Sequence, residues 1–503
     1  MNVLELSEQE IIRRNSMNEL RAMGIEPYPA AEYVTNAFST DIKAEFNDDA
    51  EPRQVSVAGR IMSRRIMGKA SFIELQDSKG RIQVYITRDD ICPDEDKEMY
   101  NTVFKRLLDL GDFIGIEGFV FRTQMGEISI HAKKLTVLAK SIKPLPIVKY
   151  KDGVAYDSFE DPELRYRQRY VDLIVNDGVK EKFLKRATVI KTMRAVLDEA
   201  GYTEVETPIL QSIPGGASAR PFITHHNSLD MDLYLRIATE LYLKRLIVGG
   251  FEGVYEIGKN FRNEGMDKNH NPEFTCMELY VQYKDYNWMM SFTEKLLERI
   301  CIAVNGCTET EIDGKTISFK APYRRLPILE AIKEKTGYDL EGKSEDEIRQ
   351  VCKELNMEID DTMGKGKLID EIFGEFCKGT FIQPTFITDY PVEMSPLTKM
   401  HRSKPGLTER FELMVNGKEL ANAYSELNDP IDQKARFERQ VEAKRREEPN
   451  TRAEVDYDFV TALEYGMAPT GGLGFGVDRL VMLLTDSASI RDVLLFPTMK
   501  PLG

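Results

Sequence analysis

The stretch that decides the fold runs from Phe261 to Tyr280 and reads FRNEGMDKNHNPEFTCMELY. Residues 253–261 before the loop are rich in Val, Tyr, Ile and Phe, and residues 273–283 after it alternate apolar and polar, so both runs predict strands. Two antiparallel strands would carry an arginine, acids, a histidine and an aromatic ring to one end. This combination suits a nucleotide, because a guanidinium binds phosphate and a flat ring stacks on a base. The alternative is an ordinary hairpin with a solvated loop.

The composition indicates a globular chain of 503 residues, long enough for roughly three domains. No apolar run approaches the ~18 residues of a membrane helix, and the start, MNVLELSEQE, has neither the basic region nor the apolar core of a secretory signal. The six cysteines form no C-x-x-C pair, which favours a reduced, cytoplasmic chain without a zinc ribbon or disulfide framework. The net charge of −15 argues against nonspecific nucleic-acid binding, although residues 60–81 carry six basic side chains against two acids.

The first half of the chain predicts a small helical part followed by a barrel. Residues 1–52 read as a helical extension, and residues 53–145 as five short strands with a short helix near 95–109, which fits an OB-type barrel. Such barrels bind single-stranded nucleic acid by stacking bases on aromatic rings. Phe72 follows a cationic loop and is expected to stack, whereas Tyr85 is expected to fill the barrel core.

A linker is predicted over residues 146–165, including Gly153, and a larger α+β domain over 166–503. The run DPELRYRQRYVDLI at 161–174 either packs between domains or touches nucleic acid. A helix is expected from Val179 to Ala200, followed by a strand, YTEVETPIL, in which Pro208 implies an edge or an interface. Glu240 stands where a strand leads into a helix. Residues of about 305–380 read as a helical insertion in which we find no chemistry.

Two acids flank a predicted hairpin in RFELMVNGKELANAYSELND, with Asn416-Gly417 as the turn. Counting back from the turn places Glu412 and Glu419 on the same sheet face, where they repel each other unless a cation lies between them. Two solvated acids on a strand are the alternative. Strict alternation would put three further residues on the opposite face, so a β-bulge between 419 and 422 is needed if all five line one pocket. These three are Asn422, Tyr424 and Glu426.

The run GGLGFGVDRLVMLLT at 471–485 predicts a glycine-rich strand that enters an apolar helix, with Arg479 at the junction. It is not a dinucleotide-binding fingerprint, because Val477 stands where the third glycine belongs. The run GVYEIGKN at 253–260 imitates a phosphate-binding P-loop, but Asn260 replaces the Ser or Thr and the intervening residues predict a strand.

Three segments together resemble the signature motifs of class II aminoacyl-tRNA synthetases. FRNE followed by HNPEF resembles the second motif, the helix, strand and Pro208 resemble the first, and GGLGFGVDR resembles the third. RYRQRYVDLI, RIATELYLKRLIVGGFE, NAYSELNDP and IRDVLLFPTMKP extend the similarity over nearly the whole chain, to bacterial-type lysyl-tRNA synthetases of subclass IIb. The resemblance implies an OB-fold anticodon-binding barrel and a six- or seven-stranded antiparallel sheet flanked by helices, in a homodimer. It also implies that lysine is activated with ATP to lysyl-adenylate and pyrophosphate and then transferred to the 3′ end of tRNA(Lys).

The resemblance further implies roles for individual residues. Arg262 would bridge the ATP α-phosphate and the amino-acid carboxylate, and Arg479 would lie over the adenine and reach the γ-phosphate; these two are the catalytic candidates. Phe274 would stack under adenine. Glu412 and Glu419 would hold Mg²⁺, with about three ions per subunit. The other implied ATP contacts are Glu264, His270 and Asn271.

An acid-lined pocket suits the ammonium group of lysine, whereas an aspartate site needs a basic side chain. The resemblance places the lysine-binding residues at Gly216, Glu240, Arg262, Glu278, Tyr280, Asn422, Tyr424 and Glu426. It places anticodon contacts at Arg64, Phe72, Gln83 and Glu127. Two positions depart from the family's usual pattern: Thr239 replaces a proline and Asn269 replaces an arginine.

Three rival interpretations remain. An aspartyl- or asparaginyl-tRNA synthetase conflicts with Glu240 and Glu278, a protein-lysylating paralogue would lack the barrel, and a noncatalytic RNA-binding relative would be expected to lose Arg262, Glu412, Glu419 or Arg479. The sequence leaves open affinities, the role of residues 305–380, a diadenosine polyphosphate side activity and continuation beyond Gly503.

Overall fold

The computed structural model describes residues 6–146, 149–151, 154–156, 158–217, 219–447 and 454–502; Gly153 of the predicted linker and the terminal Gly503 lie outside this set. The chain divides into two compact units, Met1–Glu160 and Asp161–Gly503. Within the described residues, no helix combines the length and the apolar character needed to cross a membrane.

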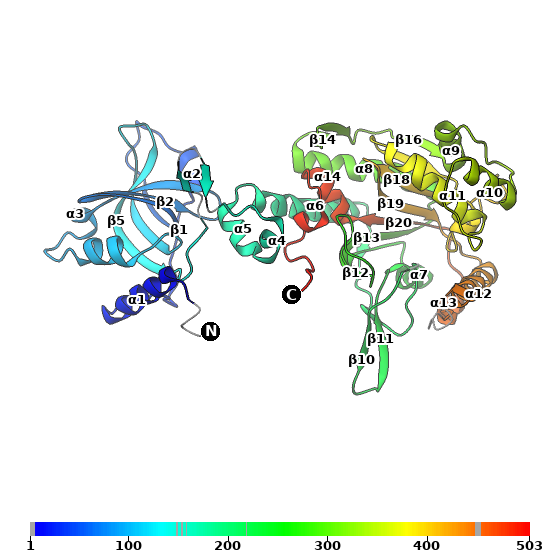
Figure 1. The fold of residues 1–503 in the computed structure, drawn as a ribbon, viewed down its shortest axis with the longest axis horizontal. Coiled ribbons are helices and arrows are strands. Elements are labelled where there is room, and N and C mark those ends of the chain that lie inside the picture. Colours follow the sequence, from blue (N-terminus) through cyan, green and yellow to red (C-terminus); the bar gives the residue numbers. More distant parts are fainter. Residues whose placement is uncertain are drawn as a thin grey trace. The chain divides into compact units, whose positions relative to one another are not determined.

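The first unit is a closed five-stranded barrel with the strand order β1-β2-β3-β5-β4 (Figure 1). Residues of β2 and β3 alternate between buried and half-buried, as expected when every second side chain points into a barrel. The OB-type barrel predicted from the sequence is therefore confirmed. Its strands are β1 (Gln54–Met67), β2 (Ala70–Gln76), β3 (Arg81–Thr87), β4 (Phe113–Arg122) and β5 (Ile128–Ala139), with α3 (Arg88–Ile91) and η2 (Met99–Leu107) between β3 and β4.

The helices that precede the barrel share its core. α1 (Glu8–Ala22) begins with a capping box in which Ser7 and Glu10 satisfy each other's backbone N–H groups. Leu20 of α1 and Ile42 of α2 (Ser39–Ala44) are buried in the same apolar cluster as the barrel strands. The described part of the predicted helical extension thus belongs to the barrel unit.

The second unit is built on an eight-stranded sheet with the order β16-β17-β18-β19-β20-β13-β12-β8. The predicted six or seven antiparallel strands need correction, because the outermost pairs, β16 with β17 and β12 with β8, are parallel. β16 also lies inside the predicted helical insertion. The strands are β8 (Thr203–Glu204), β12 (Gly253–Phe261), β13 (Glu273–Gln282), β16 (Arg324–Pro327), β17 (Thr385–Thr388), β18 (Arg410–Val415), β19 (Lys418–Ser425) and β20 (Thr470–Gly476).

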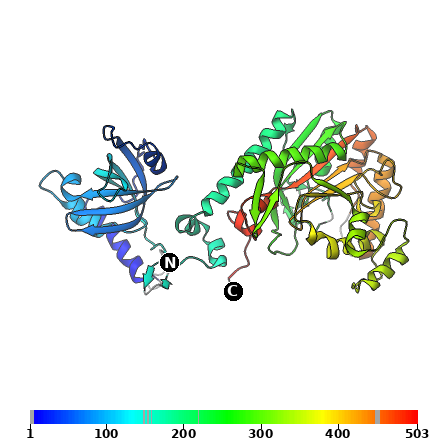
Figure 2. The ribbon, with the colours of Figure 1, turned by 90° about the horizontal axis from the view of Figure 1, so that it is seen from above.

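One face of this sheet packs on three helices: α6 (Val179–Glu199), α8 (Tyr286–Asn305) and α14 (Val477–Leu484). Figures 1 and 2 show α8 lying over the strands. Met277 and Leu279 of β13 and Ala421 and Ala423 of β19 point into this core. The residues that alternate with them in each strand point to the opposite face, and these include most of the polar residues singled out above.

The single strand predicted over YTEVETPIL is broken. β8 ends at Glu204 and β9 (Leu210–Gln211) joins a separate sheet with β10 (Ile223–His226) and β11 (Met231–Leu235). Pro208 lies between the two short strands and cannot donate to a ladder. The chain therefore changes sheets there.

Residues 161–174 form α4 (Pro162–Arg167) and α5 (Arg169–Val175) and pack within the second unit. Arg169 is buried, pairs with Asp172 and donates to the backbone carbonyls of Arg491 and Leu494. This run therefore has a packing role within its own unit.

The remaining elements follow in chain order. The turn at Asp313-Gly314 has positive φ at both residues, which an Asp-Gly pair favours, and joins β14 (Glu309–Ile312) to β15 (Lys315–Ser318). Ser344 and Glu347 form a capping box at the start of α10. The others are β6 (Lys149–Lys151), β7 (Val154–Tyr156), α7 (Glu240–Val248), α9 (Ile328–Thr336), α10 (Glu345–Glu354), α11 (Lys365–Ile372), η3 (Phe373–Cys377), η4 (Lys378–Thr380), η5 (Val392–Met394), α12 (Pro430–Glu447), α13 (Tyr457–Glu464) and α15 (Ile490–Val493).

Candidate active site

Polar residues from neighbouring strands line up across the sheet face that the three core helices leave uncovered. Glu412 pairs with Asn422, which pairs with Gly474, which pairs with Glu278. The adjacent row joins Arg410, Tyr424, Gly472 and Tyr280 in the same order of strands. The sheet register thus gathers side chains from three strands beside the glycines of β20, which supports a single site.

A β-bulge brings the acids and the predicted pocket residues to this face. Met414 pairs with Glu419, but Leu413 pairs with Ala421, so Leu420 is the extra residue. Leu420 is buried in the core. The bulge expected between 419 and 422 is therefore present, and Glu419 and Asn422 share a face as a result.

The glycines of β20 leave space for the neighbouring side chains. A Cβ atom on Gly472 would lie 2.0 Å from Oε1 of Glu426 and 2.6 Å from the ring of Tyr280. Any side chain at this position would therefore displace the acid or the ring. The glycine-rich strand provides the room in which a substrate side chain could lie.

Three acids are buried together at the start of α7 and the adjoining strands: Glu240, Glu278 and Glu426. The Tyr280 hydroxyl donates to Oε2 of Glu278 at 3.1 Å. Burial raises the pKa of Glu278, and the nearby Glu240 adds to the effect. Burial raises the pKa of Glu426 to about 8, while Lys244 acts in the opposite direction.

The other predicted pocket residues lie at the edge of this group. Asn422 donates to the Tyr424 hydroxyl at 2.9 Å, and Glu240 and Glu426 contribute to the raised pKa of Tyr424 after burial. A Cβ atom on Gly216 would come within 3.3 Å of the Cβ of Glu240, so the 215–217 loop runs close to the start of α7. The structure thus brings these residues into one neighbourhood, while Arg262, the remaining member of the predicted lysine-binding set, follows the end of β12 beside Phe274.

Thr239, which departs from the family's usual proline, precedes Glu240. Its backbone N–H donates to Oε1 of Glu278 at 3.3 Å. A proline has no N–H to donate, so this contact with the buried acid depends on the departure. At the second departure, the backbone N–H of Asn269 donates to Asp267 at 2.6 Å.

Lys244 is the pocket residue that the sequence analysis missed. It is fully buried, its Nζ lies 2.6 Å from Oε1 of Glu240, and it also pairs with Oε2 of Glu426. The i,i+4 spacing from Glu240 on a predicted helix was the available signal, but such a pair usually lies on a solvated surface.

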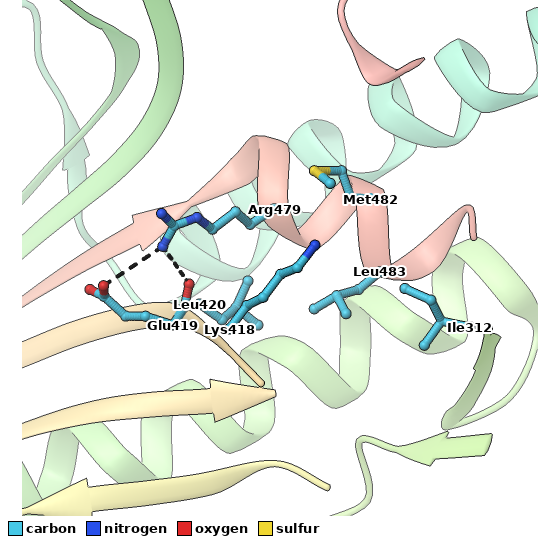
Figure 3. Close-up of a pocket in the computed structure, with 7 residues that line it drawn as sticks. All are labelled: Ile312, Lys418, Glu419, Leu420, Arg479, Met482 and Leu483. Atoms are coloured by element: carbon cyan, nitrogen blue, oxygen red, sulfur yellow. Dashed lines mark hydrogen bonds and ion pairs between the residues drawn. The ribbon is translucent and has the colours of Figure 1, made fainter. Parts of the chain in front are cut away.

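Each acid of the β18–β19 hairpin has a nearby arginine. Nη2 of Arg410 lies 2.6 Å from Oε1 of Glu412. Nη1 of Arg479 donates to the carbonyl of Glu419 at 2.7 Å and lies 3.7 Å from its Oε2 (Figure 3). Burial raises the pKa of Glu412, and the charge of Glu419 adds to this effect, which indicates that the two carboxylates are close.

The two carboxylates are the kind of ligand that a divalent metal ion takes. Mg²⁺ prefers oxygen ligands and is often held by one or two carboxylates together with phosphates and water. Nowhere in the described ranges do three acidic, histidine or cysteine side chains gather as metal ligands.

Arg479 also borders a small cavity, which has a second cation, Lys418, that no sequence motif marks. Figure 3 shows the Lys418 ammonium on the same side of the β19 strand as Arg479. Burial lowers the pKa of Lys418, and the nearby Arg479 lowers it further. The cavity is lined by Ile312, Lys418, Glu419, Leu420, Arg479, Met482 and Leu483.

The opening hairpin is formed by β12 and β13, which pair antiparallel up to Phe261 and Glu273. The guanidinium carbon of Arg262 lies 5.1 Å from the centroid of the Phe274 ring. Nε of Arg262 is buried without a hydrogen-bond partner among the described residues. A buried unpaired donor beside an aromatic ring suits a bound nucleotide phosphate.

The predicted ATP-binding residues in the hairpin loop form hydrogen bonds mainly with neighbouring residues. Nδ1 of His270 lies 2.9 Å from Oδ2 of Asp267, and Asn271 donates to the carbonyl of Glu273 at 2.6 Å. Glu264 accepts a hydrogen bond of 3.4 Å from the backbone of Arg220. Glu264 and His270 are exposed at the loop, while Asn271 is buried.

The outer face of the barrel carries an aromatic group that includes both candidate stacking residues. Phe72 and Tyr85 are direct cross-strand partners, with ring centroids 4.9 Å apart. The expectation that Tyr85 fills the core is wrong, because Ile73 and Val84, next to these residues in each strand, point inward instead. The neighbouring aromatic rings are Phe119, Phe121 and His131.

The other predicted anticodon residues are spread out. Gln83 shares the face of Tyr85 and accepts from Ser129 at 2.8 Å. Arg64 pairs across the strands with the inward Ile73 and donates to the carbonyls of Phe104 and Leu108, so the structure does not bring it to the aromatic group. Arg65 is opposite Phe72 instead. Glu127 forms an ion pair with Lys43 at 3.2 Å.

Comparisons with known proteins agree with this architecture. Residues 161–500 match the family described as tRNA synthetases class II (D, K and N), and residues 55–138 match the OB-fold nucleic acid binding domain. Together with the antiparallel-rich sheet, these matches define a class II aminoacyl-tRNA synthetase.

Curated relatives show which family within this class the chain belongs to. The chain is 67% identical to a lysine–tRNA ligase of Porphyromonas gingivalis over all of this chain and 87% of the relative. It is 63% identical to that of Azobacteroides pseudotrichonymphae over 99% of each chain, and 61% identical to that of Christiangramia forsetii over 99% of this chain and 87% of the relative. The chain belongs to the lysyl-tRNA synthetases, ligases that join lysine to tRNA. Enzymes of this family use ATP and a divalent metal ion.

Proposed function

We propose that the open sheet face binds lysine and ATP side by side, forms lysyl-adenylate, and then transfers lysine to the 3′ end of tRNA(Lys). The observation that carries this assignment is the buried group of Glu240, Glu278 and Glu426. One member, Glu278, lies on strand β13 together with Phe274 at the nucleotide end. An acidic pocket favours an ammonium side chain and disfavours the carboxylate of aspartate. The amide of asparagine would leave buried charges unpaired.

In the proposed chemistry an oxygen of the lysine carboxylate forms a bond to the α-phosphorus of ATP, and pyrophosphate leaves with the bonding electrons. Arg262 binds both reacting groups and stabilises the charge that develops between them. A ribose hydroxyl of the tRNA then attacks the activated carbonyl, and AMP leaves. The protein contributes positioning and charge, with no covalent nucleophile of its own.

The proposed ATP site uses Phe274 as a platform for adenine and Arg479 as a cover that reaches the γ-phosphate. Glu264, His270 and Asn271 would contact the base edge and the phosphate tail. Glu412 and Glu419 would hold Mg²⁺, and about three ions per subunit are proposed. Bound Mg²⁺ would neutralise phosphate charge and favour the in-line geometry. Arg410, which pairs with Glu412, favours the ionised form of that acid and so opposes the burial that raises its pKa.

The assay that tests this function is amino-acid-dependent ATP–pyrophosphate exchange with lysine, ornithine, aspartate and asparagine. We expect exchange with lysine and none with aspartate or asparagine. Exchange with ornithine should be weaker, because the shorter side chain loses about 1–3 kcal/mol of binding free energy. Glu240→Gln should lose most of the lysine-dependent exchange, whereas Glu334→Gln, which changes an exposed acid, should retain it. Exchange driven by aspartate would overturn the pocket assignment, and absence of exchange with any amino acid would overturn the activity.

The affinity for lysine should increase as pH rises from about 7 to 9. The pKa of Glu426 is raised to about 8, so its carboxyl ionises in this range, while the lysine ammonium stays charged up to about 10. The lysine KM should therefore fall with pH, and the dependence should flatten in Glu426→Gln. A flat profile in the wild type would contradict this assignment. The groups that face Glu426 are Lys244 and Glu240 of α7, Glu278 and Tyr280 of β13, and Tyr424 of β19.

The aromatic face of the barrel is proposed to bind the anticodon, with Phe72 stacking a base and Gln83 reading an edge; Arg64 and Glu127 are the further family positions. Phe72→Ala and Tyr85→Ala should each weaken tRNA binding by about 1–3 kcal/mol, the contribution of one stacked base. Filter binding or anisotropy with tRNA(Lys) measures this. Phe113→Ala, which removes a barrel aromatic outside the group, is the control and should bind tRNA like the wild type.

We also propose a homodimer that works in the cytoplasm. Ile209 and Leu210, directly after Pro208, are 46% and 48% exposed, and Ile223 on β10, the other outer strand of the small sheet, is 55% exposed. Apolar residues gathered on one small sheet favour a protein partner. Light scattering should give twice the chain mass for the wild type and a smaller mass for Leu210→Asp. An unchanged mass in this variant would place the interface elsewhere.

A further inference from the structure

Lys244 places a second ammonium group inside the pocket proposed for an ammonium substrate. It lies one helical turn after Glu240 in α7 and is fully buried. Its Nζ pairs with Glu240 on the same helix and with Glu426 on the far side of the pocket, after β19. It also lies 5.9 Å from the ring of Tyr280. A buried lysine is unfavourable unless its charge is compensated, so these acids account for its place.

The acids outnumber the cation. Glu240, Glu278 and Glu426 are all buried, and Lys244 is the cation that pairs with two of them. Oε1 of Glu426 accepts no hydrogen bond from any part of the chain that the structure describes, while Oε2 is paired with Lys244. A buried carboxylate with a free oxygen is costly, so the pocket has capacity for another cation.

We propose that Lys244 is a positioning residue for lysine activation: a resident ammonium that holds Glu240 and Glu426 in place so that their free oxygens receive the ammonium of the substrate. This inference rests on the proposed function of the pocket. An ordinary helical i,i+4 pair would explain the contact with Glu240. It would not explain the full burial of Lys244 or its bridge to Glu426.

The bridge has a physical consequence for binding. Without a cation between them, Glu240 and Glu426 would repel each other, and one would separate or take up a proton. The substrate would then meet a pocket with fewer ionised acids in less suitable positions. Lys244 avoids this because its four-carbon stem is fixed by the packing of α7 against the sheet.

The test compares Lys244→Met with the wild type in lysine-dependent ATP–pyrophosphate exchange. The lysine KM should rise about 10- to 100-fold, the range for losing a group that orients binding ligands, while the ATP KM changes less than about twofold. The pH at which lysine binding improves should move upward, since the cation that favours ionised Glu426 is gone. Arg245→Met removes the neighbouring cation, which pairs with Asp456 and Asp458, and is the matched control.

A second experiment separates charge from packing. In Lys244→Ala, added ethylammonium should occupy the vacated space and lower the lysine KM. In the wild type the same compound should compete with lysine and raise it. If Lys244→Met does not fold, Lys244→Gln is compared with the wild type in the same exchange assay, because it keeps hydrogen-bond donors but lacks the charge.

An unchanged lysine KM and pH profile in a folded, uncharged variant would overturn the proposal. Equal losses for lysine and ATP without rescue by ethylammonium would also overturn it, because they indicate a merely structural role. Failure of the proposed function is distinguished by the wild type alone, which would then show no exchange with lysine.

Discussion

Replacing Arg262 with lysine is expected to lower the rate of lysine-dependent exchange by about 10²- to 10³-fold, the loss typical for one group that stabilises transition-state charge. The guanidinium can bind two acceptors at once, and its buried Nε has no partner among the described residues. A lysine ammonium is a single point charge and would also lose the planar contact with Phe274. Steady-state exchange kinetics at saturating lysine and ATP measure the effect.

The control for this change is Arg324→Lys, which conserves charge at an exposed ion pair with Glu334. It should leave the exchange rate within about twofold of the wild type. If Arg262→Lys retained most of the rate, the bidentate role of Arg262 would be wrong, and another cation near the nucleotide would have to carry the charge.

The largest loss of stability is expected for Arg236→Met. Arg236 and Glu256 are both buried and form an ion pair of 2.5 Å. Arg236 also donates to the carbonyls of Lys259 and Thr207. Removing one partner of a buried pair leaves the other charge uncompensated, so the free energy of unfolding should fall by about 3–5 kcal/mol. Denaturant titration of the protein, followed by the fluorescence of its single tryptophan, Trp288, measures this change.

Arg324→Met is the matched control, because it breaks an ion pair of similar length at the surface. Exposed pairs contribute about 0–1 kcal/mol, so the unfolding midpoint should hardly move. Equal losses for the two variants would show that burial does not determine the contribution of Arg236.

Much of the architecture follows from local patterns. Period-two alternation predicts the barrel strands, and the Asn416-Gly417 turn fixes the register that brings Glu412 and Glu419 to one face. Other features depend on contacts far apart in the chain. β16 is only four residues long and is a strand only because it pairs with β17, some 60 residues later. Tyr85 is expected in the core because small barrels need large side chains inside. The alternation within β3 instead places it on the outer face with Arg81 and Gln83.

The candidate site was predictable where a motif marks it and not where packing creates it. Glu240, Glu278 and Glu426 come from different elements, and the family resemblance identifies them. Lys244 and Lys418 look like surface cations in the sequence because long basic side chains on helices and strands are usually solvated. Only the three-dimensional arrangement buries one of them among acids and places the other beside Arg479.

The extra residue at Leu420 sets the phase of everything that follows it in β19. If this residue were deleted, the strand would shift by one position, and the alanines that now face the helices would change places with Asn422, Tyr424 and Glu426. Core packing and substrate binding would then be lost together, since polar groups would enter the core and methyl groups would line the substrate site. Single-residue deletions in this hairpin should therefore be far more damaging than paired ones, which preserve the alternation. Leu420 is therefore the inserted residue that keeps Glu419 and the residues after it on the same face of the sheet.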